Sequence, residues 1–296
     1  MNLVSRKALV RKMIAGLALS ALAPGMALAD EDSRLDEMIS PVTNPVNFED
    51  PRSISSVRPI FMFHKIPSDF ITGSGDIQLW AAQVRLALTD RLAFLATKDG
   101  YIQINSDKVL ADSEGSANLA GGFQYAFYKD DAAGEIATAG LRYEAQTGDP
   151  DVFQGTGDGI ISPHLSGAIA LGDINLMGYT DLRLGVNDED SDFWDVSLHA
   201  DYPIANFYPS LELNMAHVVD SGHRLPLEGE GFDLVNFGSA GSDGSTVVTL
   251  GVGGRYRAAE WLDLGASYEF PLTDREDIFA WRMTFDLIFK CKDTLL

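Results

Sequence analysis

Two neighbouring polar residues have the types and spacing that nucleophilic chemistry needs. His164 and Ser166, in the segment SPHLSG, are two positions apart and therefore share one face of a strand. A serine nucleophile also needs a third group that orients its base. No strand position must supply that group, and the alternation of Leu165 and Gly167 turns the pair toward the inside of the fold. We therefore expect no catalytic residue, and an enzyme that uses this pair is the alternative.

Charged side chains form a second set, which recurs on one face of many alternating segments. The favoured interpretation is that these charges pair with each other across neighbouring strands and fill a narrow barrel. The pairs Arg142 with Glu144 and Asp181 with Arg183 fit it, because residues two apart in one strand share a face. A further possibility is that some of these charges screen solutes by sign and size. Because both signs are present, no strong ion selectivity is expected. The candidate lumen-lining residues are Arg85, Arg142, Glu144, Asp181, Arg183, Asp195, His199, Glu212, Arg255, Asp263, Glu269, Arg282 and Asp286.

Sites for metals and cofactors are not indicated by the sequence. Cys291 is the only cysteine, which excludes an intrachain disulfide and a cysteine cluster. The acidic loops lack the spacing of a calcium-binding EF-hand. Gly251 and Gly253 belong to a strand and form no phosphate cradle. We expect no cofactor and no metal.

The elements that position these side chains are clearest between residues 245 and 289. Three segments there alternate apolar and polar residues with a period of two, which is typical of strands. In the last segment Phe285, Leu287 and Phe289 oppose Thr284 and Asp286. The segments match the ~9–11 residues that a tilted strand needs to cross a bilayer. One face is apolar with aromatic ends, and the other is small, polar and charged, as expected for lipid and a water-filled lumen.

The same alternation continues back to Val57 and predicts twelve strands over residues 57–290, with one interruption at Asp99-Gly100. Short turns near residues 90, 131, 173, 204 and 259 alternate with longer loops near 70, 110, 153, 189, 230 and 275. The loop over 105–115 is acidic, and the loop over 219–244 is the longest. An even strand number with alternating short and long connections predicts an all-β fold, a transmembrane antiparallel up-and-down β-barrel with periplasmic turns and extracellular loops. A periplasmic β-sandwich is the alternative.

Features outside the predicted barrel indicate export. Residues 1–29 combine a basic start, a short apolar run and Ala27-Leu28-Ala29 before Asp30, which predicts a cleaved signal peptide. Residues 30–56 form an irregular leader, either in the periplasm, which we slightly favour, or in the lumen as a partial plug. Residues 291–296 form a short tail. The formal net charge of −21 argues against nucleic-acid binding.

The mature chain resembles a Gram-negative outer-membrane β-barrel, and within that class it resembles the transporter family named after the meta-pathway of phenol degradation. The resemblance rests on the Asn44-Pro45 leader, the hairpin LALTDRLAFLAT and the segment GGFQYAFYKD. It implies inward passage of small, often hydrophobic molecules and no catalytic residues.

These observations predict an outer-membrane channel or transporter that passes small solutes, including hydrophobic ones, through a charged lumen. A lipase-type outer-membrane enzyme, or a structural or adhesive surface barrel without transport, is the alternative. The expected partners are outer-membrane lipid and lipopolysaccharide, a small-molecule solute and the barrel-assembly machinery. The last strand matches the assembly signal in part, but the chain continues past Phe289 over residues 290–296.

Overall fold

The computed structural model describes residues 33–108 and 111–291, and the signal peptide predicted over residues 1–29 lies outside them. Within these ranges no helix is both long enough and apolar enough to cross a membrane. The helical elements are α2 (Arg34–Glu37) and the short 3₁₀ helix η1 (Pro150–Val152). The strands are β1 (Ser55–Ile66), β2 (Gly75–Ala87), β3 (Leu92–Lys98), β4 (Tyr101–Ser106), β5 (Ser113–Ser116), β6 (Leu119–Asp130), β7 (Glu135–Ala145), β8 (Ile160–Leu171), β9 (Ile174–Gly185), β10 (Asp192–Asp201), β11 (Phe207–Asp220), β12 (Thr246–Ala259), β13 (Leu262–Pro271) and β14 (Trp281–Cys291).

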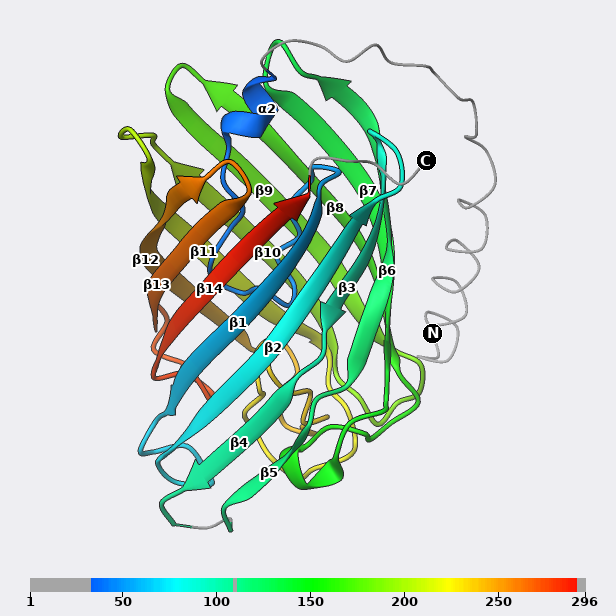
Figure 1. Ribbon diagram of the computed structural model, residues 1–296. Helices are drawn as coiled ribbons and strands as arrows, with labels where there is room; N and C mark the ends of the chain where they lie inside the picture. Colours follow the sequence, from blue (N-terminus) through cyan, green and yellow to red (C-terminus); the bar gives the residue numbers. More distant parts are fainter. Residues whose placement is uncertain (1–32, 109–110, 292–296) are drawn as a thin grey trace. The chain divides into compact units, whose positions relative to one another are not determined.

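The strands form one antiparallel sheet that closes on itself, because β1 pairs with both β2 and β14 (Figure 1). β3 and β4 both pair with β2 and are two halves of one strand, interrupted at Asp99-Gly100 as predicted. β5 pairs with β4 and β6 pairs with β3, so β5 and β6 are likewise two halves of the next strand of the wall. The wall is therefore a closed antiparallel barrel of twelve strands.

The connections alternate as predicted. Short turns cover residues 88–91, 131–134, 172–173, 202–206 and 260–261, and longer loops cover 67–74, 107–112, 146–159, 186–191, 221–245 and 272–280. Ser55 pairs with Cys291, so the first and last strands meet at the short-turn end. The loop predicted over 105–115 is shorter than expected, because Asn105 and Ser106 extend β4 and residues 113–115 begin β5.

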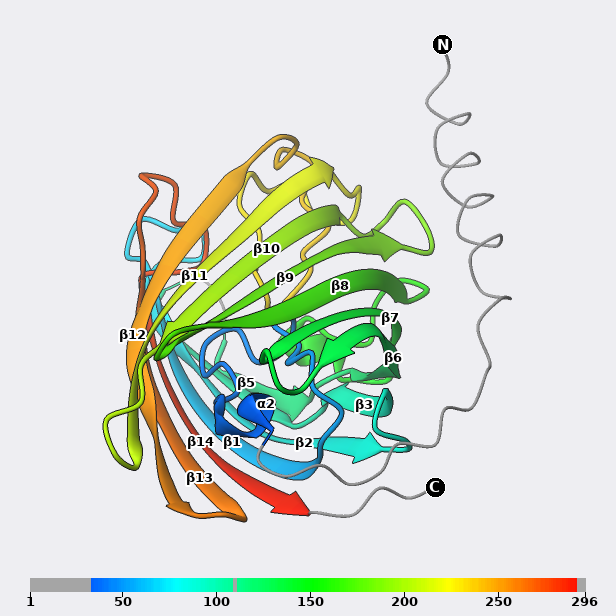
Figure 2. The same ribbon diagram turned by 90° about the horizontal axis from the view of Figure 1, so that it is seen from above.

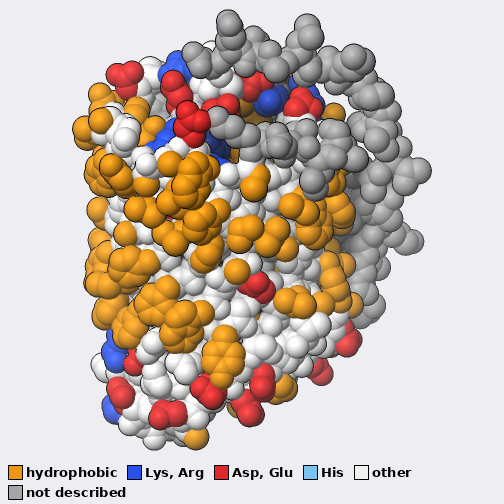
Figure 3. Space-filling model, viewed as in Figure 1, with side chains coloured by type: hydrophobic (Ala, Val, Ile, Leu, Met, Phe, Trp, Pro, Cys, Tyr) orange, Lys and Arg blue, Asp and Glu red, His pale blue; other side chains and the backbone are white. Residues whose placement is uncertain are grey.

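The outer surface of the wall is apolar. Large hydrophobic side chains alternate outward along each strand, and Leu165, Leu211 and Phe285 are about half exposed, at 53%, 55% and 46%. Hydrophobic side chains cover most of the wall that is visible in Figure 3, while charged side chains gather toward its ends. A monomer in water rarely exposes so large an apolar patch, so this surface fits a lipid environment.

Residues 33–54 lie inside the barrel, although the sequence slightly favoured a periplasmic leader. Figure 2 shows this blue segment within the ring of strands. Leu35, Met38 and Phe48 pack against inward-facing residues of β6 to β9, including Met177 and Tyr179. Prolines prevent the leader from forming a regular strand. Asn44, with a φ of 46°, begins a turn in which its carbonyl accepts from the N–H groups of Asn47 and Phe48. The many prolines that made the segment look irregular thus produce a compact luminal hairpin.

Candidate functional site: the filled interior of the barrel

The thirteen candidate side chains all point into the barrel. Eleven of them are buried, and the side chains of Arg85 and Glu144 are partly buried, with 14% of each exposed. Two segments of the same chain fill the space that they surround. One is the leader over residues 33–54, and the other is the loop over residues 221–245, which we call the β11–β12 loop.

Glu212 of β11 holds the tip of the leader. Its carboxylate accepts the backbone N–H of Val42 at 2.9 Å, the N–H of Thr43 at 2.6 Å and the hydroxyl of Thr43. His199 of β10 donates Nδ1–H to the same carboxylate at 2.8 Å, and its Nε2 faces Asp201 at 3.0 Å. Glu212 therefore accepts consecutive backbone N–H groups of the leader, as an anion does at the N-terminus of a helix, and His199 holds its carboxylate in position.

Arginines of the wall bind the carbonyl groups of the leader. Arg255 donates to the carbonyls of Ser40 and Pro41 at 2.6 and 2.9 Å, and Arg58 also donates to Pro41 at 2.9 Å. Both arginines bond the carboxylate of Asp286, with Nη1 of Arg255 at 2.5 Å. A buried guanidinium group needs hydrogen-bond acceptors for its N–H groups. Asp286 accepts some of these bonds, and the leader carbonyls accept others.

A second pair of arginines meets the leader further along. Arg142 of β7 lies 3.0 Å from Glu49 and also donates to the carbonyl of Val46 and to Asn47 at 3.2 Å. Arg85 of β2 lies 3.3 Å from Glu49 and donates to the carbonyl of Asp50 at 2.5 Å. The leader is thus attached to the wall by charge-assisted bonds along most of its length.

The leader also contains its own ion pair. Arg52 lies 2.5 Å from Asp50 and donates to the carbonyls of Leu35 and Met38 at 2.9 and 2.6 Å. Burial alone would raise the pKa of Asp50, but the guanidinium groups of Arg52 and Arg85 lower it below its ordinary value of 3.8. The leader therefore keeps its folded shape as a charged, internally bonded unit.

The β11–β12 loop closes the opposite end of the interior. Asp233 accepts two bonds from Arg282 at 2.5 and 2.8 Å, and Arg183 donates to the carbonyl of Phe232 at 2.9 Å. Glu230 accepts from Ser191 at 2.6 Å and so ties the loop to residues 186–191. In Figure 1 the loop, drawn from yellow to orange, lies among the lower ends of the strands.

The same loop covers an apolar part of the inner wall. Its Leu234, Val235 and Phe237 pack against inward-facing residues of β1, β2 and β4, which are Met62, Ile66, Ile77, Leu79, Ile102 and Ile104. Phe237 also packs on Phe153 with 5.2 Å between ring centroids. The inner wall of β1, β2 and β4 is therefore apolar toward the long-loop end, whereas Arg58 and Arg85 lie toward the short-turn end of β1 and β2.

The remaining candidates pair with other wall residues. Arg183 bonds Asp195 at 2.5 and 3.0 Å, and Glu269 lies 3.6 Å from Arg282. Glu144 pairs with Lys98 at 2.6 Å, Asp263 with Lys290 at 3.0 Å, and Asp181 with Arg142 at 3.1 Å. The charges thus pair across strands, as expected, whereas Arg142 with Glu144 and Asp181 with Arg183 form no ion pair within their strands. His199 and Asp201, two apart on β10, are a pair that does form within one strand.

His164 and Ser166 are buried on the inner face, but they do not bond each other. The hydroxyl of Ser166 lies 2.5 Å from that of Thr138, and neither ring nitrogen of His164 has a hydrogen-bond partner among the described residues. This arrangement offers no activated nucleophile of the serine–histidine type.

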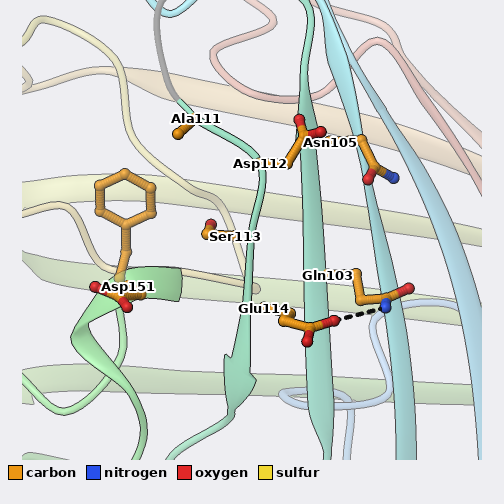
Figure 4. A pocket seen from close by; sticks show the side chains of 8 residues that line it. Gln103, Asn105, Ala111, Asp112, Ser113, Glu114 and Asp151 are labelled. Atoms are coloured by element: carbon orange, nitrogen blue, oxygen red, sulfur yellow. Dashed lines mark hydrogen bonds between the residues drawn. The ribbon is translucent and has the colours of Figure 1, made fainter.

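A pocket of about 700 Å³ lies at the long-loop end, between β4, β5 and η1 (Figure 4). Gln103 donates to Glu114 at 3.0 Å, and Asn105, Asp112 and Asp151 complete a polar, acidic lining. Within residues 33–108 and 111–291, no group of three or more metal-ligating side chains is found. The outer rim is therefore acidic, whereas the interior presents arginines.

Several functional residues were not among the sequence candidates. Arg58, Gln83 and Gln124 bond the leader directly, with Gln83 donating to Pro45 at 2.6 Å and Gln124 to Asp50 at 2.9 Å. Arg58 lies on the inward row with Ile60 and Met62, which are apolar, so the alternation did not show which face of β1 is polar. The position of the leader, which would have singled these residues out, has no signature in a period-two pattern.

Comparison with known proteins supports the fold. No family model matches the chain, and no curated protein matches it in sequence. An outer membrane channel from Pseudomonas putida F1 has a similar structure, with a TM-score of 0.56 and 14% identity, over 86% of this chain and 100% of that one. The NanC porin gives a TM-score of 0.51 at 10% identity, over 80% of this chain and 100% of the porin. The chain has the fold of an outer-membrane β-barrel.

Proposed function

We propose that this protein is an outer-membrane channel whose leader and β11–β12 loop are movable closures. A barrel of twelve strands encloses more space than its own side chains fill. Here the extra space holds two segments that are not part of the wall. Hydrogen bonds and ion pairs hold both of them, beside the apolar packing of Phe48 and Phe237. This observation carries the proposal, because a segment held by hydrogen bonds and ion pairs can exchange them for water when it moves.

The solute class follows from the apolar and charged parts of the interior. The apolar part of the inner wall, near the long-loop ends of β1, β2 and β4, offers a surface for hydrophobic parts of a small solute, and charged side chains lie further along β1 and β2 and on the other strands. This agrees with the resemblance to the transporter family of the meta-pathway of phenol degradation, whose members are thought to pass small, often hydrophobic molecules. Similar structures that are named as a channel and a porin also support a transport role.

Location and partners belong to the same proposal. We infer that the chain is exported with a cleaved signal peptide, is inserted by the barrel-assembly machinery and contacts lipid and lipopolysaccharide through its apolar wall. N-terminal sequencing of protein from outer membranes tests the cleavage, with Asp30 expected as the first residue.

Single-channel recording in planar bilayers tests the function. Protein that shows a heat-modifiable gel shift, and is therefore folded, should give brief openings from a largely closed state. Folded protein that gives no current over long recordings would favour a structural or adhesive barrel without transport.

A further inference from the structure

Glu49 places its carboxylate between two arginines of the wall. Its two oxygens lie 3.3 Å from Arg85 and 3.0 Å from Arg142, and only 4% of the Glu49 side chain is exposed. The two arginines come from β2 and β7, which are separated in the wall only by β3 and β6. Two guanidinium groups that converge on one carboxylate form a recognition site for an organic acid.

The wall supplies an acid to only one arginine of this pair. Arg142 has a wall partner in Asp181, whereas Glu49 is the acid with which Arg85 forms an ion pair. The Nε atoms of Arg85 and Arg142 have no hydrogen-bond partner among the described residues. Both ring nitrogens of His164 also lack one, and that ring lies 5.7 Å from the ring of Tyr179, which Arg142 contacts at 3.3 Å. The wall thus offers more donors than the leader uses.

A graded row of side chains leads to this site from the long-loop end. Successive inward positions of β2 are Ile77, Leu79, Ala81, Gln83 and Arg85, so the row changes from apolar to amide to guanidinium. At ~3.4 Å per residue the row extends over roughly 27 Å. A cavity of about 20 Å³ remains beside it, between Leu234 of the β11–β12 loop and Pro45 of the leader. A solute that follows the row therefore meets an apolar surface before the cations.

We propose that Arg85 and Arg142 bind the carboxylate of a small solute with an apolar body, and that Glu49 of the leader occupies this site in the closed state. The inference rests on the proposed channel function and names its solute class. Uncharged hydrophobic solutes would use only the apolar part of the row, and inorganic anions would use only the arginines. A small aromatic carboxylate such as benzoate uses both.

Calorimetric titration of the folded, detergent-solubilised chain with benzoate tests the site directly. Glu49→Gln removes the competing carboxylate, so benzoate should bind at least about tenfold more tightly than to the wild type. Benzyl alcohol has the aromatic ring without the carboxylate, and acetate has the carboxylate without the ring. Both should bind at least about tenfold more weakly than benzoate. Glu37→Gln removes an exposed carboxylate of the leader and should behave as the wild type.

A second substitution assigns the binding to the wall. Glu49→Gln with Arg85→Gln should lose the gain, Glu49→Gln with Arg85→Lys should recover part of it, and Glu49→Gln with Arg91→Gln, at the turn 88–91, should keep it. Each variant is first checked for the heat-modifiable gel shift. Benzoate that binds Glu49→Gln no more tightly than the wild type, or that still binds after Arg85→Gln, would overturn the inference.

The outcome is separable from that of the channel proposal. Currents without benzoate binding would overturn the carboxylate site and leave the channel intact. Benzoate binding by a barrel that never conducts would support the site and remove the transport role.

Discussion

Thr43 and Glu212 lie 169 positions apart in the sequence, yet the N–H of Thr43 donates to the carboxylate of Glu212 over 2.6 Å. This bond joins the tip of the luminal leader to the middle of β11. The same carboxylate accepts from Val42 and from His199. With the hydroxyl of Thr43, four donors thus converge on one buried side chain, and three of them belong to the leader.

Glu212→Gln should loosen this attachment. The amide replaces one acceptor oxygen by an NH₂ group, so at least one buried donor of the leader is left unsatisfied. We expect a loss of about 1–3 kcal/mol in the free energy of unfolding, measured by urea titration in detergent micelles. Glu37→Gln, an exposed carboxylate of α2, is the control and should change the free energy by less than about 0.5 kcal/mol. Equal stabilities of the two variants would argue against a structural role for Glu212.

The bond between Asp233 and Arg282 should make the β11–β12 loop sensitive to acid. Burial raises the pKa of Asp233, but Arg282 lowers it more, so that it lies below the ordinary value of 3.8. A lowered pKa stabilises the folded state above the unfolded value and stops doing so as the pH falls through the folded value. The difference in unfolding free energy between wild type and Asp233→Asn should therefore be constant above pH 3.8 and shrink below it.

Asp233→Asn itself leaves Arg282 buried, with the carboxylate of Glu269 3.6 Å away. At neutral pH we expect a loss of about 3 kcal/mol relative to wild type. The same urea titrations, repeated at several pH values, measure this. A difference that stays the same or grows below pH 3.8 would contradict the assignment of the charged pair.

Phe237→Ala should release the β11–β12 loop from the apolar inner wall. Phe237 is 4% exposed and packs on Phe70 and Phe153, and replacing a buried Phe by Ala costs about 3 kcal/mol. Trypsin can cut this loop after Arg224, and cleavage of a transiently open loop follows the open population. We expect cleavage roughly 100-fold faster than in the wild type. Ile71→Ala, on another outer loop and 59% exposed, should leave the rate unchanged.

Two glycines test the difference between the inner and outer faces. A Cβ at Gly140 of β7 would lie 2.3 Å from Nε2 of His164 and 2.7 Å from the carbonyl oxygen of Phe123. A Cβ at Gly178 of β9 would meet only Leu198, at 3.7 Å. Gly140→Ala should lower the free energy of unfolding by about 1–3 kcal/mol, and Gly178→Ala should not lower it. Equal effects in urea titration would contradict the close packing around His164.

The wall of the barrel could be predicted from the sequence because the alternating pattern of each strand is contained in that strand alone. Phe285, Leu287 and Phe289 alternate with Thr284 and Asp286, and such a local pattern needs no knowledge of the partner strands. The interruption at Asp99-Gly100 was equally local. Inward and outward faces followed wherever one face was charged, as on β7 and β9.

The contents of the lumen could not be predicted in this way. Pro41 and Pro45 mark the leader as irregular, but nothing in their neighbourhood says that Arg58 and Arg255 will bind its carbonyls. For the β11–β12 loop, the sequence showed only its length and its many glycines. Its position depends on contacts of Asp233 and Phe237 with residues of distant strands. Pairing of the charges across strands was expected, but the individual partners were not, since the register between strands decides which residue Arg142 meets.

The most direct test of the account is to lock the leader in place and record current. Asn44 donates to Ser197 of β10 at 3.3 Å, so Asn44→Cys with Ser197→Cys, in a Cys291→Ser background, allows a short bifunctional thiol reagent to join leader and wall. Single-channel recording before and after the reagent then measures the openings. The account predicts openings in the untreated protein that disappear on cross-linking, while the Cys291→Ser control is unaffected. Openings that continue at the same frequency after complete cross-linking would contradict a movable leader.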